Sequence, residues 1–179
     1  MPRTDRTDKK TSQKSAAEKT SPDAIALLTA DHREVETLFK AFEDAKEDDE
    51  EKAEIVEKIC EALSVHAEIE EEIFYPAARD ALSEEGEDLL DEAEVEHASI
   101  KSFVEQLQDA EPDEELYDAR VKVLCEYVTH HVKEEEGEMF PKVRKTKLDL
   151  AELGQELQAR KAELMSEAEG EPDDEEVAG

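Results

Sequence analysis

The sequence has few of the residues that bend, cross-link or interrupt a chain. Its 179 residues include five glycines, two cysteines and no tryptophan. Aromatic residues make up only 4%, whereas charged residues make up 42%, a composition typical of a soluble, helix-rich protein with a heavily charged exterior. No apolar run approaches the roughly 20 residues that a membrane-spanning helix needs. The length suits one domain with a hydrophobic core and is short for two.

The first residues also lack the apolar stretch of a secretory signal peptide, which favours a cytoplasmic location. Cysteines remain reduced in that compartment. Cys60 and Cys125 are expected on helices that are diagonal in a bundle, farther apart than the ~7 Å between Cα atoms that a disulfide tolerates. We therefore interpret both as buried thiols that pack as small apolar residues.

Basic residues are scarce relative to acidic ones. The chain has 22 lysines and arginines against 53 aspartates and glutamates, and its formal net charge is −31. Such a surface repels phosphate backbones, which argues against nucleic acid as a ligand. The excess of carboxylates fits a solvated acidic face, bulk cation binding or adaptation to a saline cytoplasm.

Composition divides the chain into three parts. Residues 1–20 are polar and aperiodic and residues 169–179 are mostly acidic, so we expect both to be disordered tails. Residues 21–168 are predicted to form one four-helix domain with a C-terminal helix. At its start, Ser21 is predicted to be the N-cap and Pro22 the first helical residue.

A shift of 65 residues superimposes the chemistry of the chain on itself. The related pairs are His32 and His97, His66 and His131, Glu70 and Glu135, and Cys60 and Cys125. Four of the five histidines take part. Chance placement of rare residues would seldom produce this repeat, and it is the strongest indication of a metal site.

Four segments have the apolar periodicity of bundle helices. In segments 22–45 and 84–110 the apolar stripe follows the spacing of a helix seam, and each of its six positions recurs after the shift. In segments 49–81 and 113–145 the stripe changes from aliphatic residues to histidine and glutamate. Each of these two segments then meets a proline, which is expected to kink or end the helix.

This pattern predicts an all-α protein, an up-down-up-down four-helix bundle built from two pseudo-symmetric αα-hairpins. A short C-terminal helix is expected to pack outside the bundle or against a partner. Its apolar positions are Leu150, Leu153, Leu157 and Leu164.

The repeated histidines and glutamates are predicted to converge at one level of the bundle. In each repeat the second histidine and the glutamate are four residues apart and project from one helix face. The six predicted metal ligands are His32, His66, Glu70, His97, His131 and Glu135. Each would carry a burial penalty of about 1–3 kcal/mol if unsatisfied. If both glutamates bridge, each of two ions receives two nitrogens and two oxygens and retains open positions, which suits iron or manganese better than a zinc pair. The alternative is a core in which the histidines form ion pairs with the glutamates.

The sequence resembles the hemerythrin-like (HHE cation-binding) domain family, whose pattern is H, H-x-x-x-E, H, H-x-x-x-E. The matching segments are ADHREVETLF, HAEIEEEIFYP, EHASIKSF and HHVKEEEGEMFP. The resemblance implies a four-helix bundle that holds a non-heme di-iron centre, with the six residues above as ligands. Oxygen-carrying members have a fifth ligand histidine where this chain has Lys101, so reversible dioxygen transport is not expected.

We therefore predict a protein that binds, senses or reacts with dioxygen, peroxide or nitric oxide. Its partner is then a small oxidant, with no nucleic acid or membrane involved. Enzyme status stays open, and an enzymatic version would be catalase-like peroxide removal by two redox ions. The alternative is an iron-responsive regulatory or interaction module, or an iron storage bundle without turnover.

Four further residues are secondary candidates for the site. His130 adjoins a ligand but lies about 100° around the helix, so we expect it to flank the site. Glu36, one turn after a ligand histidine, is a candidate auxiliary carboxylate. Glu94 forms a Glu-x-x-His pair with a ligand histidine, as in ferritin-like sites. Tyr127 is expected to pack or to donate a hydrogen bond to a bound ligand.

Overall fold

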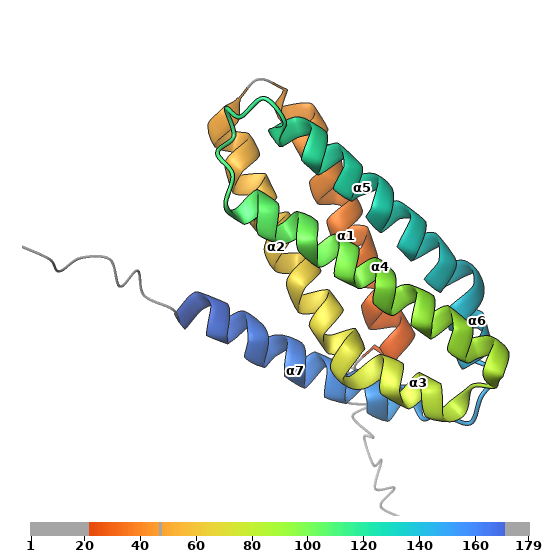
Figure 1. Ribbon diagram of the computed structural model, residues 1–179. Coiled ribbons are helices and arrows are strands. Elements are labelled where there is room, and N and C mark those ends of the chain that lie inside the picture. The colour runs from red at the N-terminus through yellow and green to blue at the C-terminus, as the bar shows by residue number, and fades with distance from the viewer. Residues whose placement is uncertain (1–21, 47, 171–179) are drawn as a thin grey trace, which may run out of the picture.

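The structure, a computed structural model, describes residues 22–46 and 48–170. Within these ranges the regular structure is entirely helical (Figure 1). In chain order the elements are α1 (Ala24–Ala45), α2 (Asp49–Ile69), η1 (Glu70–Phe74), α3 (Tyr75–Ala81), α4 (Glu84–Gln108), α5 (Tyr117–Glu134), η2 (Glu135–Met139), α6 (Phe140–Val143) and α7 (Leu150–Gly170). None of the described helices is long and apolar enough to cross a membrane.

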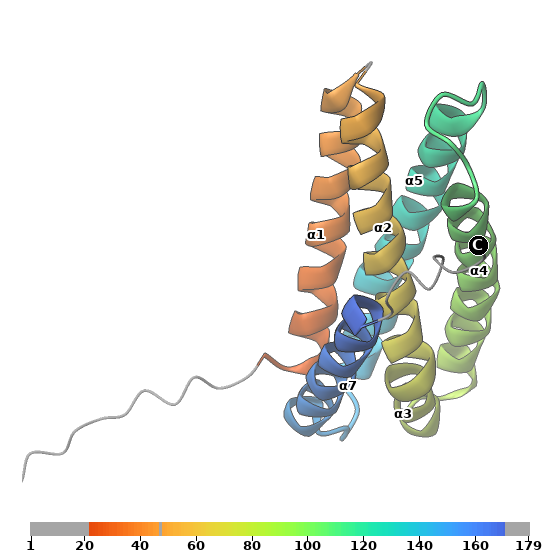
Figure 2. The ribbon, with the colours of Figure 1, turned by 90° about the vertical axis from the view of Figure 1, so that its left-hand side faces the viewer.

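Helices α1, α2, α4 and α5 form the bundle. α1 packs against α2 and α4 against α5, and the two hairpins meet where α2 packs on α4. Figure 2 shows the two hairpins side by side, with α7 on the side of α1 and α2. The predicted all-α, up-down-up-down four-helix bundle is thus confirmed.

The start of α1 differs from the prediction. The N-cap is Asp23, whose Oδ1 accepts a hydrogen bond from the Ala26 N–H at 2.8 Å. Pro22 precedes the cap and is not the first helical residue, and Ser21 lies outside the described residues. Aspartate is as good an N-cap as serine, so the cap moved two residues along the same Ser-Pro-Asp sequence.

Other boundaries were shifted as well. The fourth bundle helix begins at Tyr117, four residues after the predicted position 113. α7 has 21 residues, which makes it longer than the short helix predicted, and it continues to Gly170, into the segment expected to be a disordered tail. The tails predicted at residues 1–20 and beyond 170 lie outside the described residues.

Each of the two proline-containing helices passes through one wider, π-helical turn just before its proline. Beyond this turn α3 runs in a different direction from α2 (Figure 1), as expected of a kink. The Tyr75 N–H donates to the Glu70 carbonyl and the Phe140 N–H to the Glu135 carbonyl, five residues earlier. The proline follows at the next position in each case. Proline lacks a donor and clashes with the carbonyl four residues before it, and the wider turn accommodates both defects.

The hydrophobic core consists of two clusters on either side of a buried polar layer. The proline-end cluster lies next to the two prolines and includes Leu28, Ile69, Phe74, Leu90 and Phe140. The far-end cluster lies toward the α1–α2 turn and includes Val35, Phe39, Ile59, Val104 and Leu124. The polar layer between them contains all six predicted ligands.

Both cysteines are free thiols, as predicted. Cys60 is buried, and burial raises its pKa to about 11, which keeps it protonated. Cys125 is only partly buried, so the prediction of a fully buried thiol is wrong for that residue.

Helix α7 completes the proline-end cluster by packing on α1, α2 and η1 (Figure 2). Leu157 is fully buried there. Polar contacts reinforce the packing: the Arg160 guanidinium pairs with Glu68 and Glu72 of the second bundle helix. The chain itself therefore covers the apolar face of α7.

We expect Gly154→Ala to destabilise the fold by about 1–3 kcal/mol, although alanine is the better helix former by about 1 kcal/mol. A Cβ at Gly154 would lie 2.5 Å from the Pro22 carbonyl oxygen and 2.8 Å from the Ala24 nitrogen. These are backbone atoms, so relief requires α7 to move away from the start of α1. Urea unfolding measures the change. Gly137→Ala is the control, because no heavy atom lies within 4 Å of its Cβ. Equal stability of the two variants would contradict this packing.

Candidate metal centre

The six predicted ligands meet in the polar layer, and none is more than 6% exposed. His32 comes from α1, His66 from α2, His97 from α4 and His131 from α5. Their side chains form two groups whose ligand atoms lie within 4.8 Å of one another. The groups are His32, His66, Glu70 and Glu135, and Glu70, His97 and His131.

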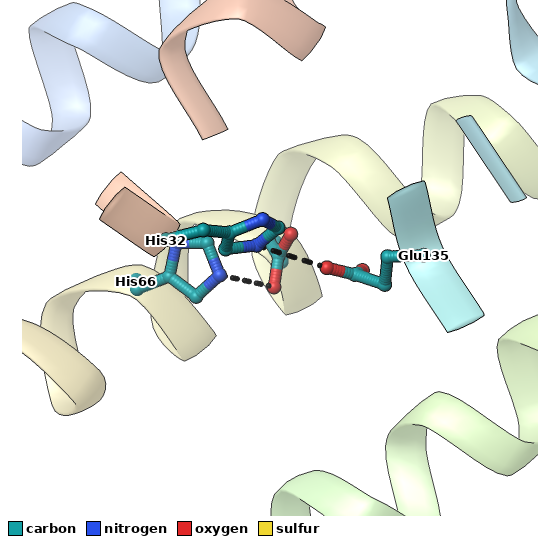
Figure 3. A group of neighbouring side chains, drawn as sticks. His32, His66 and Glu135 are labelled. Carbon is teal, nitrogen blue, oxygen red and sulfur yellow. Dashed lines mark ion pairs between the residues drawn. The ribbon is translucent and has the colours of Figure 1, made fainter. Parts of the chain in front are cut away.

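Each glutamate stands between one histidine of each hairpin. The Glu70 Oε2 lies 3.2 Å from the His66 Nε2 and 3.4 Å from the His97 Nε2. The Glu135 Oε2 lies 3.2 Å from the His32 Nε2 and 3.5 Å from the His131 Nε2. Figure 3 shows Glu135 facing His32. The 65-residue shift exchanges these two sets of contacts. Both carboxylates are therefore placed to bridge two ions.

Glu70 and Glu135 are the first residues of the two π-helical turns. Such turns are rare and concentrate at functional sites. The extra residue of each turn falls between the glutamate and the proline. The helix backbone therefore changes at the level where the inward-facing residues change from apolar to histidine and glutamate. The sequence signals this only through the proline that follows each glutamate.

A second ring of carboxylates faces the other ring nitrogens of the histidines, and three of these four contacts are hydrogen bonds. The four Nδ1 atoms lie 2.8 Å from Glu136 for His32, 3.6 Å from Asp31 for His66, 3.0 Å from Glu71 for His97 and 2.9 Å from Glu96 for His131. We call Asp31, Glu71, Glu96 and Glu136 the outer carboxylates. They obey the same shift, because Asp31 corresponds to Glu96 and Glu71 to Glu136. A carboxylate at Nδ1 fixes the imidazole proton there and directs Nε2 toward a metal.

Lys101 belongs to this outer layer. Its Nζ lies 2.6 Å from Glu71, which in turn holds the Nδ1 of His97. The residue at the position of the fifth histidine thus supports a ligand from outside. The proposed centre keeps the four imidazoles of the repeat.

Sequence analysis missed Tyr75 as well as the outer carboxylates. Tyr75 is 1% exposed, and its hydroxyl lies 3.0 Å from the Glu135 Oε1, 3.3 Å from the Glu70 Oε2 and 3.2 Å from the His97 Nε2. Its counterpart in the repeat is Phe140, which stacks on the His32 ring at 5.8 Å. The Tyr/Phe difference makes the two halves of an otherwise symmetric centre unequal, and comparing these positions would have revealed it.

The electrostatics of the layer favour a bound cation. Burial opposes ionisation of His131, but the charges of Glu135, Glu96 and Glu70 raise its pKa to about 9. Burial likewise opposes ionisation of Glu135, and the surrounding imidazoles nevertheless lower the pKa of its carboxyl. The neighbouring carboxylates raise the pKa of His32 as well, against the opposing effect of burial.

Several buried polar atoms of the layer lack a hydrogen-bond partner. They are the Nε2 of His32, both ring nitrogens of His66, the Glu70 Oε1, the Glu135 Oε2 and the Asp31 Oδ2. Each such atom costs about 1–3 kcal/mol if left unsatisfied. The His32 Nε2 and His66 Nε2 lie at ion-pair distance from Glu135 and Glu70 but make no hydrogen bond. Nitrogen and oxygen donors in such a set suit divalent metal ions. The donor set therefore fits a metal pair better than an ion-pair core.

The secondary candidates lie outside the centre. Glu36 pairs with Arg33 at the surface, and Glu94 pairs with Arg79 at 2.8 Å. Tyr127 is 44% exposed and packs on Phe103, which supports the packing alternative. The structure thus contradicts a ligand role for Glu36 and Glu94. His130 is exposed at the rim of the centre, as expected of a flanking group.

Comparisons with known proteins agree with this geometry. The model of the hemerythrin HHE cation binding domain matches residues 23–143. A DNA nickase from Nostoc sp. is 31% identical over 118 residues, which cover 66% of this chain and 32% of that protein. The chain therefore spans about a third of the relative's length. The fold is similar to a crystal structure of a hemerythrin HHE cation binding domain-containing protein from Mycobacterium kansasii, with a TM-score of 0.70 and 24% identity. That likeness covers 82% of this chain and 90% of the other.

Proposed function

The chain belongs to the hemerythrin HHE cation-binding family, and from this we propose that it is a non-heme di-iron protein that binds, senses or reacts with dioxygen, peroxide or nitric oxide. Manganese is the alternative metal, since the same nitrogen and oxygen donors suit it. The observation that carries the proposal is the pair of buried carboxylates, each shared between histidines of the two hairpins.

A small apolar cavity beside the centre supports a small, uncharged ligand. All four histidines line it, together with aliphatic residues of the far-end cluster such as Val35, Leu63, Ile100 and Val128. The cavity volume, measured as the space open to the centre of a water molecule, is about 20 Å³. One molecule of that size therefore fits. A cavity of this size excludes larger substrates and would place a diatomic molecule between the histidines and aliphatic side chains.

Two redox-active ions in this site would supply electrons to such an oxidant. The protein side chains would position the metal site and shield it from solvent. The outer carboxylates orient the imidazoles, and the two hydrophobic clusters exclude bulk water. Burial and the charges of Glu70 and Glu135 raise the pKa of Tyr75 well above its usual value, so the phenol keeps its proton and can donate it in a hydrogen bond.

The DNA-nicking activity named for the Nostoc relative is not part of this proposal. The match covers a third of that protein, and a net charge of −31 repels a phosphate backbone.

The free cysteines fit the proposed cytoplasmic location.

Anaerobic loading of metal-free protein with ferrous iron tests the proposal. We expect two ions per chain by metal analysis and, after oxidation, near-ultraviolet charge-transfer bands that zinc cannot give. Stopped-flow spectra with dioxygen, peroxide and nitric oxide then identify the reacting molecule. Failure to bind iron or manganese in stoichiometric amount would refute the metal assignment, and unchanged spectra with all three oxidants would refute the ligand class.

We expect Tyr75→Phe to destabilise the metal-free protein by about 1–3 kcal/mol, because a buried carboxylate loses a hydrogen-bond donor. The variant recreates at position 75 the residue that the repeat places at position 140, so its size suits the site. Urea unfolding of metal-free protein gives the difference. Tyr127→Phe is the control and should be neutral, because Tyr127 is 44% exposed. Equal effects of the two substitutions would show that the Tyr75 hydroxyl adds nothing to the centre.

A further inference from the structure

The four outer carboxylates differ in the charged group that each contacts on the side away from the centre. Three pair with a lysine or arginine, namely Asp31 with Lys161, Glu71 with Lys101 and Glu136 with Arg33. Glu96 has no such partner among the residues that the structure describes. Its Oε1 instead lies 3.3 Å from the Nε2 of His130, and that same nitrogen lies 3.4 Å from the Glu134 Oε1. At Glu96, an imidazole shared with a second carboxylate therefore takes the position that lysine or arginine takes at the other three outer carboxylates.

The repeat shows that this side of the bundle is built differently. Positions 130 and 134 correspond to Val65 and Ile69, which are buried in the proline-end cluster with leucines of α7. Figure 2 shows α7 beside α1 and α2, and over the described residues no fifth helix packs in the same way on α4 and α5. His130 is 58% exposed and Glu134 is 30% exposed as a result. In the α1–α2 hairpin, α7 covers this face with apolar contacts. The equivalent face of the α4–α5 hairpin is exposed and polar.

The open face offers metal-binding chemistry of its own. Ligand atoms of Glu96, His130 and Glu134 lie within 4.8 Å of one another, and one imidazole with two carboxylates suits divalent transition ions. Glu96 also connects this group to the centre, because its other oxygen lies 2.9 Å from the Nδ1 of His131.

A small cavity leads inward from this group. Glu96 and Glu134 of the surface group line it together with His131 and Glu135 of the centre. Glu135 is 1% exposed, and its Oε2, which lies 3.2 Å from the His32 Nε2, makes no hydrogen bond. A buried carboxylate of the centre therefore borders the same space as the two surface carboxylates.

We propose that Glu96, His130 and Glu134 form a surface site that captures a divalent metal ion and passes it to the centre. This inference rests on the proposed metal-binding function. The captured ion supplies the positive charge that lysine or arginine supplies at the other three outer carboxylates. The acidic surface, at a net charge of −31, concentrates cations around the site and speeds their arrival.

Cobalt uptake by metal-free protein tests the proposal. In a stopped-flow instrument, the visible bands of Co²⁺ report its arrival at the buried centre. The double variant His130→Ala/Glu134→Gln is expected to slow uptake by about tenfold or more at low cobalt concentration, the lower end of electrostatic steering effects. It should still bind two central ions at equilibrium. Glu96 is left intact because it orients His131.

Glu138→Gln is the matched control, since it removes the same charge from an exposed residue of the same segment. Uptake by this control is expected at the wild-type rate. A double variant that fills as fast as the wild type would overturn the proposed site. Equal slowing of the control would also overturn it, by assigning the effect to overall charge. If wild-type protein takes up no cobalt at the centre, the proposed function fails and not merely the route.

Discussion

Replacing His66 and His131 together with alanine is expected to reduce iron binding from two ions per chain to none. Each histidine belongs to a different one of the two groups of ligand atoms in the polar layer. Each ion thus loses one of its imidazoles, and the neighbouring Glu70 and Glu135 keep charges without their nearest helix partners. Metal analysis after anaerobic loading and the near-ultraviolet spectrum of oxidised protein measure the loss.

His130→Ala is the control for this experiment, because it removes the histidine next to His131 in sequence. Its side chain is exposed and points to the rim, so the variant should bind two ions at equilibrium. Far-ultraviolet circular dichroism shows whether each variant keeps its helices. If the His66/His131 variant is folded and retains two iron ions with unchanged bands, the ligand assignment is wrong.

The bundle and the convergence of the six candidate ligands were predictable for one physical reason. In a helix, direction follows sequence spacing, so residues such as His66 and Glu70 at four-residue separation project from one face. A repeat that places them on matching stripes then brings them to the same level. The N-cap was less predictable, since serine and aspartate are equivalent caps within the same three residues.

The outer layer needed the structure. Among 53 acidic residues, composition does not single out the four that hold imidazole nitrogens. The contact between Lys161 and Asp31 spans 130 residues of sequence and exists only because α7 docks on the bundle. The π-helical turns are likewise a change of hydrogen-bond register, which periodicity does not report. The Tyr75/Phe140 difference, by contrast, was visible in the repeat.

Removing the metal is expected to lower the melting temperature of loaded protein by roughly 10 °C without unfolding the bundle. Free metal at 100 to 1,000 times the dissociation constant stabilises the folded state by about 3–4 kcal/mol, and for a chain of this size each kcal/mol corresponds to about 2–4 °C. The stabilisation arises because metal satisfies the buried atoms of His32, His66, Glu70 and Glu135 that lack partners. Thermal unfolding with and without a chelator measures the shift.

The persistence of the helices separates the proposed function from an iron-responsive module. The far-end cluster contains 17 buried hydrophobic residues and none of the six predicted ligands, so it should hold that half of the bundle together without metal. Loosening should be confined to the amides of η1 and η2, where Glu70 and Glu135 are anchored, and hydrogen exchange resolves it. If chelation instead abolished most of the helical circular dichroism, metal would control folding itself. The chain would then be a regulatory module that responds to iron, and the oxidant would not be its primary ligand.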